Sequence, residues 1–329
     1  MEKRLELVHF QLTRNCNLRC WFCGQWGRHG FFSDASGKEM SLDDWKSVVG
    51  TLEKYREKTG FSPSVMLWGG EPLTCPYFGE IAEYIAERSF KLGVVTNGVL
   101  IDRWADVLRE KFAKIYVSVD GDEKIHNSIR GEGVFQKVRS NMELLCGTNA
   151  KITVMTVISD AVLGILEDLP DILECMHPSE LLLQEMIYLT DDEIARYKQW
   201  FESSFAAVPT EIDSWRMAPD GDFLRRKSEA LARVMEKSYS YPVRYMPHGA
   251  PNGRSHCLSP FRHAHIAWNG NVLYCTDFYD FCAGNVHSEE LTDVFENSLS
   301  EKFREGILNG KCPTCSHCSW INSERFDFR

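Results

Sequence analysis

The segment LVHFQLTRNCNLRCWFC, residues 7–23, carries the pattern that decides the fold. Its first seven residues form an apolar run that predicts a strand, and three cysteines follow on the loop that leaves it, at Cys16, Cys20 and Cys23. Three thiolates on one loop can hold three irons of a cubane cluster and leave the fourth iron open. A structural zinc site is the alternative, and it would need a fourth ligand such as His29.

Six strand segments alternate with segments of helical period between residue 5 and about residue 187. Repeated strand and helix units of this kind indicate a parallel sheet. Ser41 and Asp44 form a capping pattern at the start of the first helical segment. We therefore expect an α/β fold, a partial (β/α)6 TIM barrel with its site at the carboxyl ends of the strands. The predicted strands span residues 7–13, 64–69, 91–97, 114–120, 151–159 and 180–186.

Short glycine-containing turns follow the second, third and fourth predicted strands. They read GGEP at residues 69–72, TNG at 96–98 and SVDG at 118–121, and an IRG stretch follows at 129–131. Any one of them can be an ordinary turn, but their ordered recurrence after successive strands is hard to obtain by chance. Taken with the CxxxCxxC loop, in which Phe22 precedes the third cysteine, these motifs make the sequence resemble the radical S-adenosylmethionine (SAM) superfamily.

The resemblance implies that the three loop cysteines hold a [4Fe-4S] cluster whose open iron chelates SAM. Reduction of the cluster would cleave SAM to methionine and a 5′-deoxyadenosyl radical, which abstracts a substrate hydrogen. Ser118 and Arg130 would help to hold the carboxylate and ribose of SAM. The family's glycine motif on the fifth strand is not recognisable here, so the adenine contacts stay open. The cofactor-binding residues implied are Phe22, Gly69, Gly70, Glu71, Pro72, Thr96, Asn97, Ser118, Asp120 and Arg130.

A second group of cysteines lies near the end of the sequence. It comprises Cys257, Cys275 and the CPTCSHC segment that contains Cys312, Cys315 and Cys318. The spacing suits zinc or an iron-sulfur cluster, and it resembles the SPASM and twitch extensions of radical SAM enzymes. The resemblance implies one auxiliary [4Fe-4S] cluster held by Cys257, Cys275 and two of the last three cysteines. A second site would need the remaining thiol with His256, His263, His317 or Cys282.

The composition changes near Pro247 to His, Asn, Gly and Cys, after two amphipathic helical segments. We therefore expect a radical SAM core over residues 1–245 and a small α+β iron-sulfur domain over residues 246–329. The isolated cysteines Cys75, Cys146, Cys175 and Cys282 are expected to be small buried hydrophobes.

The chain has a net charge of −10 and no basic run, which argues against nucleic acid or an anionic membrane as a partner. It has no signal-like apolar start and no stretch long enough to span a bilayer, so we expect a cytoplasmic protein. Twelve cysteines in a reducing compartment favour metal ligands over disulfides. The resemblance also implies an electron donor such as a flavodoxin or ferredoxin.

An auxiliary cluster favours oxidation of a substrate, either a peptide side chain or a small carbinol, with the cluster as electron acceptor. Asp277, two residues after Cys275, is the candidate catalytic base, and Gln184 and Glu185 are weaker candidates for substrate contact, of which strand alternation would turn one inward. The alternatives are a redox-neutral epimerase, with Cys75 or Cys282 as hydrogen donor, a peptide cross-linking maturase, and a zinc-binding structural protein.

Overall fold

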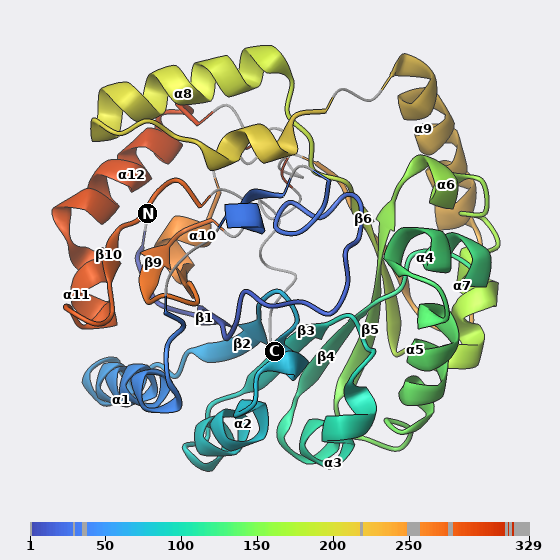
Figure 1. Ribbon diagram of the computed structural model, residues 1–329, viewed down its shortest axis with the longest axis horizontal. Coiled ribbons are helices and arrows are strands. Elements are labelled where there is room, and N and C mark those ends of the chain that lie inside the picture. The colour runs from blue at the N-terminus through green and yellow to red at the C-terminus, as the bar shows by residue number, and fades with distance from the viewer. Residues whose placement is uncertain are drawn as a thin grey trace.

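The computed structural model describes residues 2–28, 30–34, 38–217, 220–248, 257–275, 279–312, 315 and 318. Its strands form one curved sheet in the order β10-β9-β8-β1-β2-β3-β4-β5-β6-β7 (Figure 1). Neighbouring strands from β1 to β7 are parallel, which confirms the predicted partial barrel. The six predicted strands are β1 (Leu7–Gln11), β2 (Ser64–Trp68), β3 (Leu92–Thr96), β4 (Lys114–Ser118), β5 (Lys151–Ile158) and β6 (Glu180–Glu185).

Helices cover the outer face of this sheet (Figure 1). The predicted capping box is present at the first of them, where Ser41 and Asp44 exchange hydrogen bonds with each other's backbone. In chain order the α-helices are α1 (Leu42–Thr59), α2 (Phe78–Glu87), α3 (Ile101–Lys111), α4 (Glu123–Arg130), α5 (Val134–Glu143), α6 (Asp160–Leu163), α7 (Leu169–Leu173), α8 (Asp191–Phe205), α9 (Gly221–Glu236), α10 (Ser259–Arg262), α11 (Leu291–Glu296) and α12 (Ser298–Leu308).

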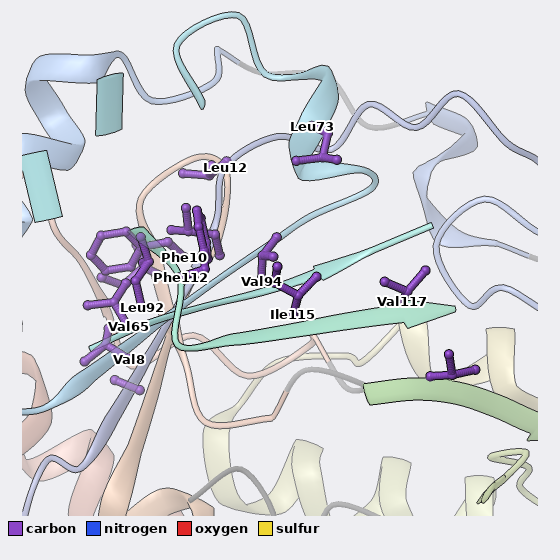
Figure 2. Packing of buried hydrophobic residues seen from close by; sticks show 14 of the residues in the cluster. Val8, Phe10, Leu12, Val65, Leu73, Leu92, Val94, Phe112, Ile115 and Val117 are labelled. Atoms are coloured by element: carbon purple, nitrogen blue, oxygen red, sulfur yellow. The ribbon is translucent and has the colours of Figure 1, made fainter. Parts of the chain in front are cut away.

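The main apolar core lies between the sheet and its helices. Side chains such as Val8, Val94 and Val117 project from one face of their strands into it (Figure 2). The opposite face lines the inside of the barrel, where Leu7, Met66 and Tyr116 form a separate small cluster. Because successive residues of a strand point to opposite faces, each strand supplies both the core and the interior.

The C-terminal part of the chain extends the same sheet. β8 (His263–Ile266) runs parallel to β1, and β9 (Asn271–Leu273) and β10 (Gly284–Asn285) follow it as antiparallel strands. On the opposite side, β7 (Val243–Met246) adds a seventh parallel strand beside β6 and spans the boundary expected at residue 245. The tail therefore joins the barrel by strand pairing as well as by side-chain packing. No helix in the described part of the chain is long and apolar enough to cross a bilayer.

Candidate functional site

A solvent-open cavity of about 1200 Å³, here called the mouth cavity, lies at the carboxyl ends of β1 to β6. The predicted cysteine loop and the predicted turns meet there, as expected for the ends of parallel strands. Pro72 and Asp120 are the two predicted cofactor-binding residues that do not line it. Those that do are Phe22, Gly69, Gly70, Glu71, Thr96, Asn97, Ser118 and Arg130, together with Cys16, Cys20 and Cys23.

The glycines of the GGEP turn are required by the cysteine loop. A Cβ on Gly69 would lie 2.4 Å from the carbonyl oxygen of Thr13, and a Cβ on Gly70 would lie 2.3 Å from that of Asn15. The Gly70 and Glu71 amides donate to the same two carbonyls, each at 2.8 Å. The turn therefore braces the start of the loop that carries the three cysteines.

Glu71 is buried and joins the GGEP turn to the TNG turn. Its carboxylate accepts hydrogen bonds from the Thr96 hydroxyl and the Asn97 amide, each at 2.7 Å, and from the Leu73 amide at 3.1 Å. Burial raises the pKa of Glu71 to about 7, although these donors favour its ionised form. Through these hydrogen bonds Glu71 holds the GGEP and TNG turns together, so it acts as a positioning residue.

Asp120 positions Arg130 at the wall of the mouth cavity. One carboxylate oxygen of Asp120 pairs with the Arg130 guanidinium at 2.7 Å, and the other accepts from the Val157 amide at 2.8 Å. Asp120 is fully buried and only 9% of the Arg130 side chain is exposed. The pair therefore links β4, α4 and β5, and leaves Arg130 at the cavity surface.

The three loop thiols suit metal coordination. The amides of Leu18 and Trp26 donate to the Cys16 and Cys23 sulfurs, each at 3.4 Å. Burial raises the pKa of Cys16 to about 12, so without a metal this group stays a neutral thiol. A bound cation would favour the thiolate, and the amide donors would then stabilise its charge. Three thiols around an open cavity fit a cluster with one ligand position left free.

All five predicted tail cysteines line a second cavity of about 640 Å³, here called the tail cavity. Cys312 hydrogen-bonds Cys315, and this contact, burial and the nearby Cys257 and Cys318 raise the pKa of Cys315 well above its usual value. Aromatic side chains, including Tyr274, Phe281 and Phe303, complete the wall. The donor set fits one iron-sulfur cluster and has one thiol more than the four that such a cluster needs.

The isolated cysteines differ from one another. Cys75 is buried, as expected, and Cys282 is half-buried, with its thiol donating to the Gly284 carbonyl at 3.2 Å. Cys146 and Cys175 are exposed, so the expectation of buried thiols is wrong for them. Cys146 lies just after α5 and Cys175 lies in a short 3-10 turn, where the chain is at the surface. None of the four lines either cavity.

Gln184 and Glu185 both line the mouth cavity, whereas strand alternation predicted only one of them. β6 ends at Glu185. The carboxylate of Glu185 forms an ion pair with Lys227 at 2.6 Å, contacts Nδ1 of His248 at 3.2 Å and accepts a hydrogen bond from the Tyr245 hydroxyl. These three partners come from α9, β7 and the residues after β7, and no local motif marks them. His29, His256, Asp277 and His317 lie outside the described residues.

Two family models match the chain, the radical SAM superfamily over residues 10–173 and an iron-sulfur cluster-binding domain over residues 257–319. Two relatives from Methanosarcina barkeri are each 24% identical. One is an AdoMet-dependent heme synthase, with 94% of this chain and 88% of the relative covered. The other is an Fe-coproporphyrin III synthase, with 98% and 83% covered.

Among solved structures, Streptococcus suis SuiB bound to its precursor peptide SuiA superposes with a TM-score of 0.65 at 17% identity. The match covers 99% of this chain and 74% of SuiB, and it shows a shared fold. The two family models show that the chain belongs to the radical SAM superfamily: it is an enzyme that uses SAM, a [4Fe-4S] cluster and an auxiliary iron-sulfur cluster in its C-terminal domain.

Proposed function

We propose that the chain is a radical SAM oxidoreductase that removes a hydrogen atom and then an electron from its substrate, with the auxiliary cluster as electron acceptor. The observation that carries the proposal is the gathering of five thiols around the tail cavity. Four thiolates satisfy every iron of a cubane cluster and leave no position for a substrate. A cluster held in this way is suited to accept an electron.

In this proposal Cys16, Cys20 and Cys23 hold the SAM-binding cluster, and four of the five tail cysteines hold the auxiliary one. When bound, the first cluster and SAM supply a carbon radical that takes a hydrogen atom from the substrate. Arg130 and Ser118 line the mouth cavity and bind the carboxylate and ribose of SAM. Asp120 and Glu71 keep Arg130 and the TNG turn in place for that contact.

The placement of the remaining thiols favours oxidation over a redox-neutral reaction. An epimerase of this kind needs a thiol that returns a hydrogen atom to the substrate radical. Cys75 and Cys282, the two candidates, are absent from the residues that line the mouth cavity, and Cys75 is 2% exposed. This placement disfavours either thiol as the hydrogen donor to a substrate bound beside SAM.

We assign the proton-accepting role to Asp277. Its segment begins at Cys275, which lines the tail cavity, and ends at Tyr279, whose ring lies 6.5 Å from that of Trp68 in the wall of the mouth cavity. Asp277 lies between these two residues in the sequence, and its carboxylate would take the proton that the substrate loses as its electron passes to the auxiliary cluster. The substrate then loses two hydrogens in total, one as an atom and one as a proton.

The substrate is a peptide or a small molecule. The two Methanosarcina relatives are named for making iron porphyrins, and SuiB is bound to a precursor peptide. An iron porphyrin, a peptide panel and a set of carbinols therefore form the first group of substrates to test.

The test is anaerobic incubation of the reconstituted enzyme with SAM, a chemical reductant and each candidate in deuterated water. Oxidation predicts a product lighter by about two mass units, formed together with 5′-deoxyadenosine. Deuterium gained at a retained carbon centre would instead support epimerisation and contradict the proposal. The Asp277→Asn variant should retain SAM cleavage and lose substrate oxidation if Asp277 is the base.

A further inference from the structure

Three histidines lie together inside the barrel, away from the mouth cavity. β1 and β8 are parallel neighbours, and their register places Leu7 beside His263 and His9 beside His265. The rings of His9 and His265 are stacked with centroids 4.2 Å apart, and His9 and His263 are 5.9 Å apart. One ring nitrogen of each histidine lies within 4.8 Å of the others.

The environment of these rings favours the neutral form that binds metals. Each of the three histidines is 5% exposed or less. Burial lowers the pKa of each, and to about 4 for His263. Neutral imidazole is the common protein ligand of zinc and of related divalent ions.

A neighbouring serine orients His265. The Ser259 hydroxyl donates to the Tyr274 carbonyl at 3.1 Å, so toward His265 Nε2, 3.5 Å away, it can act only as an acceptor. With its ring proton on Nε2, His265 can donate to this oxygen and keeps a lone pair on Nδ1. That Nδ1 is buried and has no hydrogen-bond partner within the described residues. A hydrogen bond donated by the ring nitrogen that does not bind the metal is typical of metal-ligating histidines.

A second buried polar group lies two residues further along β1. Gln11 is fully buried and is on the same strand face as His9, and neither its amide oxygen nor its amide nitrogen has a partner in the described part of the chain. Buried polar atoms without partners are rare in folded proteins. A metal ion held by three histidines commonly binds one water or hydroxide as its fourth ligand. That ligand would give the Gln11 amide a hydrogen-bond partner.

We propose that His9, His263 and His265 bind one divalent transition-metal ion of the zinc class inside the barrel. The ion has a structural role: it joins β8, the first strand of the C-terminal domain, to β1, the first strand of the barrel. His265 also lines the tail cavity, so the ion holds the wall of the auxiliary-cluster site against the barrel. The site is separate from both clusters and does not depend on the proposed reaction.

The first test measures zinc in the anaerobically reconstituted, desalted holoenzyme by mass spectrometry, beside iron and sulfide. We expect about one zinc per chain in addition to the cluster iron. The His9→Ala and His263→Ala variants should lose the zinc, whereas His287→Gln, at a half-exposed histidine of the same domain, should keep it. Chelation should lower the melting temperature of the wild-type enzyme more than that of the His263→Ala variant.

Zinc-edge X-ray absorption of the wild-type enzyme provides a readout that does not depend on whether a variant folds. A shell of nitrogen or oxygen at about 2.0 Å with imidazole scattering supports the site. A sulfur shell at about 2.3 Å would place the zinc on cysteines and overturn the proposal. Wild-type enzyme without zinc would also overturn it, as would a His265→Gln variant that loses iron and keeps zinc.

Discussion

The mouth cavity and the tail cavity are both lined by cysteine thiols, but they differ in the number of thiols and in how open they are to solvent. Three cysteines line the mouth cavity, which is open and measures about 1200 Å³, beside polar groups such as Ser118 and Arg130. Five cysteines line the tail cavity, which measures about 640 Å³ and has a mostly aromatic and aliphatic wall. A cluster with three protein ligands can bind SAM, whereas one with four is suited to electron transfer. The number of thiols at each cavity therefore separates the two roles.

The largest expected effect is at the mouth cavity. Replacing Cys16, Cys20 and Cys23 with alanine should reduce SAM cleavage to background, because no cluster would hold SAM. SAM cleavage is measured as the 5′-deoxyadenosine formed under reducing conditions, which is quantified by chromatography. Persistent SAM cleavage by the triple variant would place the SAM-binding cluster on the tail cysteines and contradict the roles assigned to the two cavities.

The matching change at the tail cavity should separate two steps of the reaction. The Cys257→Ala/Cys275→Ala variant should still form 5′-deoxyadenosine but should give no oxidised product, because the substrate radical has no electron acceptor. Cys146→Ala, at an exposed cysteine outside both cavities, is the control and should match the wild-type enzyme. Product formation at the wild-type rate by the double variant would show that the tail cluster is not the acceptor.

The buried ion pair at the mouth cavity should dominate the stability changes. Asp120→Ala leaves the Arg130 guanidinium without its partner, and we expect a loss of about 3–5 kcal/mol in the free energy of unfolding. Asp102→Ala removes an exposed pair with Lys137 and should cost less than about 1 kcal/mol. Anaerobic urea unfolding of both variants tests this, and similar losses would refute the assigned role of Asp120.

Glu71 should make stability depend on pH. Burial raises its pKa from 4.5 to about 7, so between these values the folded protein binds a proton that the unfolded chain has released. Stability should therefore fall as pH rises from about 4.5 to about 7, by up to about 3.5 kcal/mol at ~1.4 kcal/mol per pH unit. The Glu71→Gln variant should lack this component when unfolding is compared at pH 5 and pH 8. Parallel pH profiles for the two proteins would count against a protonated Glu71.

The smallest effects concern two glycines. Gly70→Ala places a Cβ 2.3 Å from the Asn15 carbonyl oxygen, and we expect it to displace the cysteine loop at a cost of about 1–3 kcal/mol, with weaker SAM cleavage. Gly50→Ala, inside α1 with no atom near its added Cβ, should stabilise the protein by up to about 1 kcal/mol. Melting temperatures of both variants measure the difference. An unchanged melting temperature for Gly70→Ala would contradict the proposal that the GGEP turn braces the cysteine loop.

The six parallel strands and the two cysteine groups could be predicted because their signals are local. Strand and helix periods, the spacing of Cys16, Cys20 and Cys23, and the turns after successive strands all lie within short segments. The function of the GGEP glycines as a brace for the cysteine loop could not be predicted, since it depends on contact between residues 69–70 and residues 13–15.

The rest of the site depends on pairings between distant segments. β7 is four residues long, and its signal was too short to indicate a seventh strand. The partners of Glu185 come from elements that begin more than 30 residues later in the chain. The cluster of His9, His263 and His265 exists only because β8 pairs with β1, and no local pattern marks that register.

The central claim is that the cysteines of the mouth cavity and those of the tail cavity hold two different clusters. Iron and sulfide analysis of the anaerobically reconstituted wild-type enzyme tests this claim most directly. We expect about eight irons and eight sulfides per chain, and about four of each when the three mouth-cavity cysteines are replaced. About four irons in the wild-type enzyme, or about twelve, would contradict it, as would zinc in place of iron at the tail cysteines.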